Sequence, residues 1–309
     1  MHDINITHHH EVVEEHFAGC CLDCKQSLEI IKPHILSFHD RVSKLSQVHL
    51  PDLNAEELYG LYSALDDIAH LKVGDHLAEL VLKDKDIERL LPEVRIYYTN
   101  FFDIHEKHLA REISETTNDP WDIIDRFPLL DRYLTLTKNH TRALSFRNDR
   151  SIAFLGCGHL PMTAFLLAKI HGSTVTAIDI DSEAVENARR CIRKLALSEK
   201  IEVIHGNEDI LENLLDKEPH DILVAAMAEP KKQIFASIEK FIDNYPTTTV
   251  SYRTYTGIRA ILYKPFLPDE IHGFQPIETI PPTGRVNNTT IFLQRVSREP
   301  AAQTENGRK

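Results

Sequence analysis

The 309-residue sequence lacks any apolar run close to the roughly 20 residues that would span a bilayer. Its first residues also lack the basic and apolar regions of a signal peptide. Positive charge is scarce as well, because 47 Asp and Glu face 35 Lys and Arg, for a formal net charge of −12. This balance argues against nucleic acid or an anionic membrane as a partner. We therefore expect a cytoplasmic protein that acts on small molecules.

Cysteine is scarce and unevenly placed, with five residues in all and three of them crowded near the start. An odd number without regular spacing argues against a disulfide framework, so reduced thiols are expected. Thiolate and imidazole are ligands that zinc prefers, but only one Cys-x-x-Cys pair is present. Residues 1–29 are thus interpreted either as a loosely ordered arm or as a metal-binding arm, whose candidate ligands are His8, His9, His10, His16, Cys20, Cys21 and Cys24.

Glycine-rich and low-complexity linkers are also absent, and the first half of the chain instead shows helical periodicity. Apolar residues recur at spacings of three and four between Ile30 and Leu65. Asn54, followed by Ala55-Glu56-Glu57, predicts a capped helix start. The pattern predicts an all-helical domain over residues 30–148.

Two further helices are expected within that domain. The longer covers residues 86–116 and is expected to be interrupted or kinked near Pro92, because proline lacks a backbone N–H. The shorter covers residues 129–144. The polar stretch Arg147-Asn148-Asp149-Arg150 marks the boundary with the second half of the chain.

From Ser151 onward, short β-rich runs alternate with amphipathic helices, which is typical of a parallel sheet with crossover helices. The runs predict strands at residues 151–155, 174–178, 201–204, 222–226, 247–252, 276–280 and 289–295. Seven strands that end in an antiparallel hairpin match the α/β class, specifically the class I methyltransferase-like Rossmann domain with its mostly parallel sheet. This domain is expected over residues 149–297, followed by a disordered tail at 298–309.

The first predicted strand runs into Gly156-Cys157-Gly158, and the second ends at Asp179. Glycines let the backbone approach a ligand closely, and an acid after the second strand can accept hydrogen bonds from ribose hydroxyls. Pro161 stands where a dinucleotide fingerprint needs its third glycine, and the Lys-Ser/Thr pair of a phosphate loop is missing. A ribose-bearing cofactor without pyrophosphate fits best. S-adenosylmethionine is the leading candidate, and an ordinary strand-to-helix loop is the alternative.

Cofactor contacts are expected along the carboxyl ends of the first four strands. Amide and nucleobase methyltransferases carry Asn/Asp-Pro-Pro-Tyr/Phe after the fourth strand, and that motif is missing here. Its absence weakens only one methyltransferase interpretation. The expected cofactor contacts are Gly156, Cys157 and Gly158 in the turn, Asp179 at the ribose, Asn207 or Asp209 at the adenine amine, and Ala226 after the fourth strand.

Beyond the turn, the sequence resembles the nicotianamine synthase family. Plant members read Gly-Ser-Gly-Pro-x-Pro-Leu-Thr-Ser and then Asp-Ile-Asp, where this chain has Gly156-Cys157-Gly158-His159-Leu160-Pro161-Met162-Thr163-Ala164 and Asp179-Ile180-Asp181. The helical half matches too, with Val42-Ser43-Lys44-Leu45 against Ile-Ser-Lys-Leu and Asp131-Arg132-Tyr133-Leu134 against Ser-Asn-Tyr-Leu. The resemblance covers roughly residues 30–296.

This resemblance implies a transferase that moves 3-amino-3-carboxypropyl groups from S-adenosylmethionine to an amine and releases methylthioadenosine. The nicotianamine branch condenses three such groups, whereas bacterial opine-metallophore relatives join one to histidine. Either product binds transition metals, while catalysis is expected to need no metal. The alternatives are a small-molecule methyltransferase and a non-enzymatic scaffold that binds metal through its His/Cys arm. A homodimer is left open.

The resemblance also implies which residues carry the reaction. Glu106 matches the family's Glu-x-His segment and is the expected general base, on a long helix that should cap the cofactor pocket. Tyr133 is expected to orient the amine or to accept its proton. Arg253 and Arg259 are expected to hold α-carboxylates, because a guanidinium can bind a carboxylate bidentately.

Several departures from the plant pattern bear on the acceptor. Asn100-Phe101-Phe102 stands where plant enzymes carry Glu-Ala-Glu, and Leu129 and Leu130 stand where they carry paired tyrosines. His159 replaces a family proline, and a packing role is expected for it. The acceptor and the number of transfers are therefore left open.

Overall fold

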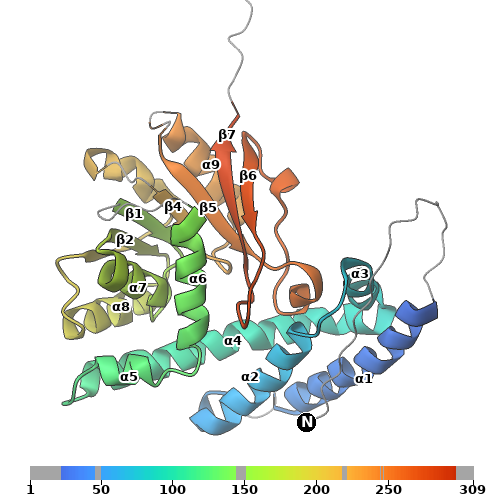
Figure 1. Ribbon diagram of the computed structural model, residues 1–309. Helices are drawn as coiled ribbons and strands as arrows, with labels where there is room; N and C mark the ends of the chain where they lie inside the picture. The colour runs from blue at the N-terminus through green and yellow to red at the C-terminus, as the bar shows by residue number, and fades with distance from the viewer. Residues whose placement is uncertain are drawn as a thin grey trace, which may run out of the picture.

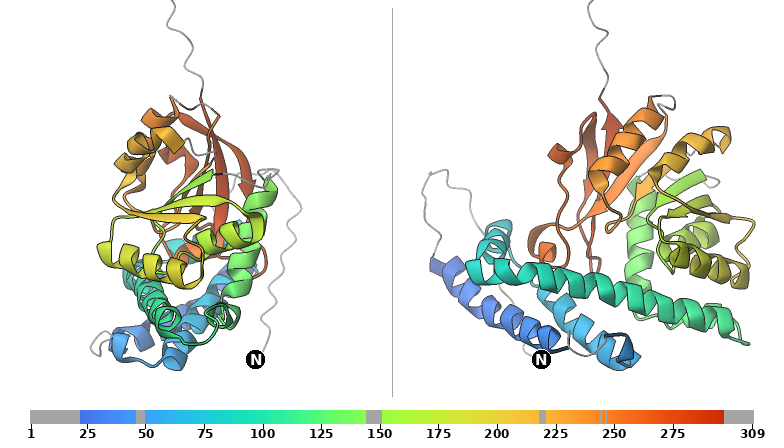
Figure 2. Two further views of the ribbon diagram at one scale, coloured as in Figure 1. Left: turned by 90° about the vertical axis from the view of Figure 1, so that its left-hand side faces the viewer. Right: turned by 180° about the vertical axis from the view of Figure 1, so that it is seen from behind.

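The computed structural model describes residues 22–45, 50–143, 151–217, 221–243, 245 and 247–296. A helical layer from the first half of the chain lies beneath an α/β half, and the long helix α4 (Lys85–Glu115) runs between them (Figure 1). Figure 2 shows the same arrangement from the side and from behind. The predicted arm before residue 22, the polar seam at 147–150 and the predicted tail at 298–309 lie outside the described residues.

The helical layer begins earlier than expected, since its first helix contains Cys24, which is buried. The capped start predicted at Asn54 is confirmed, because its side chain accepts a hydrogen bond from the Glu57 N–H at 2.9 Å. The elements of this layer are α1 (Leu22–Leu45), η1 (Leu50–Asp52), α2 (Ala55–Ala69), α3 (Asp75–Lys83), α4 and α5 (Trp121–Asp125). The last helix of the first half, α6 (Leu130–Ala143), rises from this layer and stands beside the sheet (Figure 1).

The predicted interruption of the long helix at Pro92 does not occur, and α4 continues through that residue. The neighbouring side chains of Leu91 and Val94 are both buried in the core. Packing on both sides of the proline holds the helix together and outweighs the loss of one backbone hydrogen bond. The continuity matters because it places Glu106, which lies on α4 beyond Pro92, against the α/β half.

The sheet has seven strands within the described residues, in the order β3-β2-β1-β4-β5-β7-β6. The pairs from β3 to β5 are parallel, and β7 is antiparallel to both β5 and β6. The predicted class I methyltransferase-like fold is therefore confirmed. The strands are β1 (Ser151–Leu155), β2 (Thr174–Asp179), β3 (Ile201–His205), β4 (Asp221–Val224), β5 (Thr249–Thr254), β6 (Phe274–Ile280) and β7 (Thr289–Arg295).

Two apolar cores cover the two faces of this sheet. Along β1, Ile152 and Phe154 enter one core while Ala153 and Leu155 enter the other, as the alternation of a strand requires. The first core is shared with the helical layer, so the two halves of the chain pack as one body. The elements that accompany the sheet are α7 (Met162–His171), α8 (Ser182–Lys194), η2 (Glu208–Lys217), α9 (Lys231–Ile242), η3 (Gly257–Ile261) and η4 (Pro268–Glu270).

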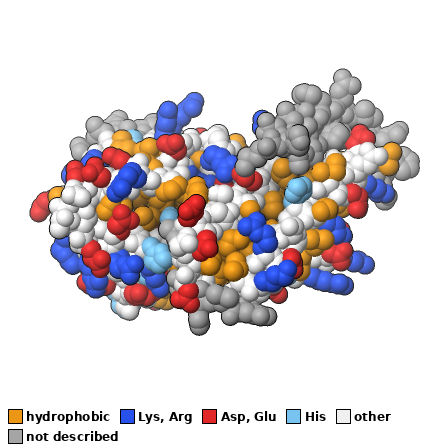
Figure 3. Space-filling view, turned by 90° about the horizontal axis from the view of Figure 1, so that it is seen from below, with side chains coloured by type: hydrophobic (Ala, Val, Ile, Leu, Met, Phe, Trp, Pro, Cys, Tyr) orange, Lys and Arg blue, Asp and Glu red, His pale blue; other side chains and the backbone are white. Residues whose placement is uncertain are grey.

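The lower face of the molecule belongs to the helical layer. Hydrophobic side chains form patches there between Lys, Arg, Asp and Glu, and charges of both signs are mixed (Figure 3). This face therefore presents no continuous basic surface among the residues that the structure describes. None of the helices in the described part combines the length and the apolar character that crossing a bilayer requires.

A buried ion pair joins three parts of the chain. Arg132 on α6 donates to both carboxylate oxygens of Asp66 on α2, at 2.9 Å each, and also contacts the Tyr62 hydroxyl. From the loop between β6 and β7, Arg285 and Asn287 donate to the same carboxylate at 2.6 and 3.0 Å. Burial alone would raise the pKa of Asp66, but the Arg132 charge and its other partners hold that pKa below its usual value.

Removing one member of this pair should be costly, because the other charge stays buried. We expect Arg132→Met to lower the free energy of unfolding by about 3 kcal/mol. The matched control is Lys44→Met, which breaks an exposed pair with Asp40 and should cost at most about 0.5 kcal/mol. Urea unfolding of both variants tests this expectation, and equal midpoints would contradict it.

Candidate active site

A cavity of about 590 Å³ opens at the carboxyl ends of the five strands β1 to β5. Helices α4 and α6 close it from the helical layer, as the resemblance implied for α4. Among the residues predicted to form the site, those that line this cavity are Glu106, Tyr133, Gly156, Cys157, Gly158, Asp179, Asn207, Ala226 and Arg253. The structure therefore brings together side chains that lie more than one hundred residues apart in the sequence.

The turn after β1 needs its two glycines for conformation and for space. Gly156 and Gly158 have φ values of 78° and 72°, in the left-handed region that glycine adopts readily. A Cβ atom on Gly156 would lie 2.7 Å from the Ala228 Cβ, and one on Gly158 would lie 2.7 Å from the Glu106 Oε2. Ala228 and Glu106 thus pack so closely on the turn that neither glycine position has room for a side chain.

Asp179 closes the turn from the end of β2. Its Oδ2 accepts a hydrogen bond from the Gly158 N–H at 2.8 Å, and its Oδ1 accepts one from the Asp181 N–H at 3.0 Å. A carboxylate has about four acceptor positions, so these two bonds leave capacity for a ligand hydroxyl. The geometry is therefore compatible with the predicted contact to a ribose.

Glu106 faces the turn from α4, with its Oε2 3.5 Å from the Leu160 backbone N. Burial raises the pKa of Glu106 to about 8, opposed by the N–H groups of Leu160 and His159 and reinforced by the charges of Asp179 and Asp103. At pH 7 most of this carboxyl group is protonated. It ionises in the range where a general base is most effective.

Tyr133, on α6, is half-buried beside the same region of the cavity. Burial, and then the negative charge of Glu106, raises the pKa of Tyr133 above its usual value. Its hydroxyl therefore keeps its proton at neutral pH. Of the two roles expected for Tyr133, this favours orienting a substrate by hydrogen bonding over accepting a proton.

Arg253 is a buried cation with free donors. Only 4% of the residue is exposed, and its Nη1 donates to the Thr163 Oγ1 at 2.9 Å. Its Nε and Nη2 have no hydrogen-bond partner among the described residues. Burial lowers the pKa of Arg253 to about 10, which still leaves the guanidinium charged at neutral pH. A carboxylate is the natural partner for this pair of donors.

Arg259 was expected to act similarly, but it is not among the described residues that line the cavity. It lies on η3, and its Nε donates to the Val286 carbonyl oxygen at 3.2 Å. This contact holds the loop between β6 and β7. The residue therefore supports the wall of the site from behind.

The region after β3 also differs in detail from the expectation. Asn207 lines the cavity, whereas Asp209 is exposed and pairs with the Asn207 amide at 3.0 Å. Between them, Glu208 lines the cavity, is 5% exposed and has an Oε1 without a partner. Glu208 is thus better placed than Asp209 to accept a ligand N–H. The sequence showed an acid in this segment but left its register uncertain.

The turn after β4, which contains Ala226, is held by a lysine that the sequence did not single out. Lys231, at the start of α9, is 2% exposed and donates to the carbonyl oxygens of Ala226 and Ala228 at 2.6 and 2.9 Å. Burial lowers the pKa of Lys231, and Glu229 opposes this effect. The ammonium group fixes the wall that packs on Gly156.

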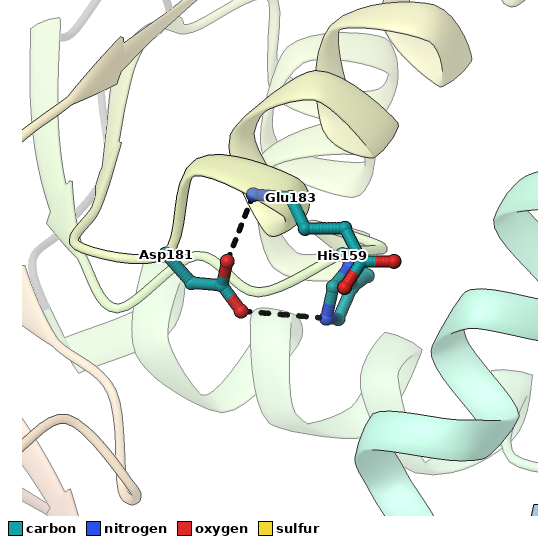
Figure 4. Close-up of side chains that lie close together, drawn as sticks. All are labelled: His159, Asp181 and Glu183. Carbon is teal, nitrogen blue, oxygen red and sulfur yellow. Dashed lines mark hydrogen bonds and ion pairs between the residues drawn. The ribbon is translucent and has the colours of Figure 1, made fainter.

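His159 lies beside the acidic side chains of Asp181 and Glu183, and the three offer possible metal ligands within 4.8 Å of one another (Figure 4). However, His159 is already held by Asp103 and by the Asn187 amide, both at 3.0 Å. Lys107 lies 3.1 Å from the carboxylates of Asp103 and Glu183 and supplies positive charge there. The arrangement joins α4 to α8, in agreement with the packing role expected for His159.

Comparison with known proteins adds to this geometry. The family model described as nicotianamine synthase protein matches residues 24–299. Nicotianamine synthase 1 of Arabidopsis thaliana is 26% identical over 285 residues, which cover 88% of this chain and 86% of that protein. The L-histidine 2-aminobutanoyltransferase of Pseudomonas aeruginosa is 27% identical over 127 residues, covering 41% of this chain and 47% of that protein.

Comparison with solved structures indicates the same family. The crystal structure of MtNAS in complex with MTA and tNA has a TM-score of 0.80 and 30% identity, covering 90% of this chain and all of that chain. A mutant of MtNAS in complex with S-adenosylmethionine gives a TM-score of 0.78 at 29% identity, with the same coverage. Fold and site define a class I methyltransferase-like protein with a helical cap. The chain belongs to the nicotianamine synthase family, as the resemblance predicted.

The contact between Gly158 and Glu106 can be tested against a second glycine. Gly158→Ala should weaken binding of S-adenosylmethionine at least about tenfold, because the new methyl group displaces the Glu106 carboxylate. Gly172→Ala is the matched control, since Gly172 also has a positive φ but a Cβ there meets nothing within 4 Å. Calorimetric titration of both variants measures the difference. Equal affinities would show that the contact does not matter for binding.

Proposed function

We propose that this protein is an S-adenosylmethionine-dependent aminocarboxypropyltransferase that makes a nicotianamine-type metal chelator. The observation that carries the proposal is the pairing, in one cavity, of a carboxyl group with a pKa of about 8 and a buried arginine with two free donors. Family membership supports it, and so does the similarity to MtNAS, which extends through the helical layer that supplies Glu106.

S-adenosylmethionine is the proposed substrate and supplies a γ-carbon activated by the sulfonium. In the reaction, a bond forms between the acceptor nitrogen and that carbon while the bond from the carbon to sulfur breaks. Sulfur keeps the electron pair, so the positive charge is lost and methylthioadenosine leaves. The acceptor nitrogen must give up a proton, and Glu106 receives it. Atoms and charges balance without an oxidant or a reductant.

Glu106 suits this role because of its position and its acidity. A carboxylate with the usual glutamate pKa would be a weak base toward the proton of an amine. With a pKa near 8, the acidity of Glu106 comes closer to that of the acceptor amine, and proton transfer between them becomes easier. Tyr133 keeps its proton and is proposed to orient the acceptor nitrogen by hydrogen bonding. Arg253 is proposed to bind an α-carboxylate through its free Nε and Nη2.

The adenosine part of the substrate is proposed to lie along the strand ends. Asp179 would accept hydrogen bonds from the ribose, and the cavity-lining Asn207 and Glu208 would contact the adenine. Ala226 and the turn formed by Gly156, Cys157 and Gly158 would pack against the nucleoside. No metal is assigned to catalysis, since the donors required for proton transfer and carboxylate binding are all side chains of this chain.

The domain limits inferred from the sequence remain part of the proposal. Residues 30–148 are proposed to form a helical domain that caps the active site, and residues 149–297 the domain that binds S-adenosylmethionine. The transition metal is proposed to bind the released product, and the compartment is proposed to be the cytoplasm.

A second candidate keeps the same chemistry but uses histidine as the acceptor in a single transfer. It is favoured by Phe102, which makes the cavity wall apolar in a segment where plant enzymes carry acids. This difference in the wall is where a different acceptor would be accommodated. Phe101 and Leu129, at two other departures from the plant pattern, are buried in the core. The similarity to the L-histidine 2-aminobutanoyltransferase of Pseudomonas aeruginosa supports this candidate.

Product analysis distinguishes these candidates. The full-length protein is incubated with S-adenosylmethionine alone and with added L-histidine, and the products are identified by mass spectrometry. We expect methylthioadenosine together with nicotianamine from S-adenosylmethionine alone. A single adduct that forms only with histidine would support the second candidate. Release of S-adenosylhomocysteine, the mark of methyl transfer, would contradict both.

Glu106→Gln tests the proposed base. The substitution keeps the shape of the side chain but removes proton transfer, so kcat should fall by roughly 10² to 10⁴-fold. In the unmodified protein, kcat/KM should fall about tenfold per pH unit below a pKa near 8 and level off above it. The variant should lack that limb of the profile. An unchanged profile would remove Glu106 from the mechanism.

Stability measurements control for misfolding of this variant. The folded-state pKa of Glu106 lies above its unfolded value, so protonation stabilises the fold below the unfolded pKa, and this contribution is lost as the pH rises through about 8. Glu106→Gln should therefore be more stable than the unmodified protein above pH 8. A loss of activity together with this gain in stability identifies a functional role.

A further inference from the structure

Asn287 lies in the loop between β6 and β7, at the part of the cavity wall next to Tyr98. Only 1% of the residue is exposed. Its Nδ2 donates to the Asp66 Oδ1 at 3.0 Å and lies 3.4 Å from the Tyr98 hydroxyl. Its Oδ1, in contrast, has no partner among the described residues. A buried acceptor without a partner is costly unless a ligand or water satisfies it.

The orientation of this amide is determined by its neighbours. A carboxylate can only accept hydrogen bonds, so Asp66 must face the nitrogen of Asn287 and not its oxygen. Arg132 and Arg285 both bind Asp66 and keep it ionised. The amide therefore cannot turn over without placing its oxygen against a negative charge. This leaves Oδ1 as a buried acceptor of fixed orientation on a residue that lines the cavity.

The free donors of Arg253 belong to the same wall. Strand β5 pairs with β7 so that Arg253 lies opposite Thr290, three residues after Asn287. Tyr98 links Asn287 to the end of β5, because its hydroxyl contacts both Asn287 and the hydroxyl of Tyr255, two residues after Arg253, the latter at 3.2 Å. All four residues line the cavity. The wall thus combines an oriented acceptor oxygen with a guanidinium that has two free donors. This is the complement of an amine and a carboxylate on one small molecule.

We propose that Asn287, oriented by Asp66, accepts a hydrogen bond from the amine of an α-amino-acid head group whose carboxylate lies on Arg253. In this account Asn287 touches the substrate, and Asp66 is a positioning residue that acts through it. The inference rests on the proposed function for the identity of the ligand. Such a head group occurs both in the tail of S-adenosylmethionine and in a separate amino-acid acceptor.

Asn287→Leu in the full-length protein tests the proposal, because leucine has a similar size but no hydrogen-bonding groups. Asn139→Leu is the matched control, since the Asn139 amide donates to Thr283 of the same loop at 3.2 Å but is not among the cavity-lining residues. The probes are S-adenosylmethionine, methylthioadenosine, L-2-aminobutyrate and butyrate. Methylthioadenosine lacks the head group, and butyrate lacks only the amine.

If the head group is the tail of the substrate, Asn287→Leu should bind S-adenosylmethionine about 10-fold to 100-fold more weakly and methylthioadenosine with unchanged affinity. If it belongs to a separate acceptor, the affinity for S-adenosylmethionine should be unchanged and only L-2-aminobutyrate should bind more weakly. In either case, the preference for L-2-aminobutyrate over butyrate should disappear in Asn287→Leu and persist in Asn139→Leu. A merely structural role for Asn287 would not change that preference.

Two results would overturn the proposal. One is unchanged affinity for all four probes, and the other is an equal loss for methylthioadenosine, which would indicate general damage to the cavity. Asn287→Ser covers the case in which the leucine variant does not fold, because it removes the amide oxygen but keeps a small polar side chain beside Asp66. The failure of the proposed function is separable, since the binding assays do not depend on turnover. A protein that releases no methylthioadenosine would fail that proposal alone.

Discussion

The structure depends on the close approach of α4 to the glycine turn after β1. With glycine at position 158, the Glu106 carboxyl group occupies the space where a side chain would otherwise stand. This contact removes Glu106 from water, and burial is the main reason that its pKa rises to about 8. The need for glycine at position 158 therefore couples the helical layer to the sheet, and it also gives Glu106 a pKa suited to a general base. A methyltransferase-like sheet without the helical layer would have the turn but not the carboxyl group.

A second coupling operates where the loop between β6 and β7 meets the helical layer. Asp66 gathers Arg132 from α6 together with Arg285 and Asn287 from that loop, so helices and sheet meet on a single buried carboxylate. A buried ion pair contributes little net stability, but it strongly disfavours arrangements that leave its charges unpaired. In this protein it fixes the direction of a side chain at the cavity wall. The two couplings place Glu106 and Asn287 at fixed positions around the same cavity.

Much of this arrangement could be predicted from the sequence, and the reasons for the misses are physical. Strands such as Ser151–Leu155 are short, apolar and bounded by polar residues, so their limits matched the predictions closely. The glycine turn and Asp179 were predicted from the local pattern, whereas Glu106 was predicted from the family resemblance alone. The structure places all of them at one cavity. The interruption considered at Pro92 does not occur, because packing on both sides of it, which local rules do not describe, maintains the helix.

The remaining misses concern long-range partners. Asn287 and Asp66 are 221 positions apart, and no local pattern relates them. Arg259 and Arg253 look equivalent as isolated residues, yet only Arg253 lines the cavity with free donors. Asp209 was predicted in place of Glu208, because a shift of one residue after β3 decides which of the two acids lines the cavity. The types of residue at the candidate site could thus be predicted from the sequence. The direction in which each side chain points could be determined only from the folded structure.

Contact with the glycine turn buries Glu106, so that its carboxyl group is mostly protonated at neutral pH and ionises near pH 8. Infrared difference spectra between the unmodified protein and Glu106→Gln, recorded across a pH titration, isolate the carboxyl band of this residue. We expect the protonated-carboxyl band to be present at pH 7 and to disappear with a midpoint near pH 8. A midpoint near the usual value for glutamate, about 4.3, would contradict it.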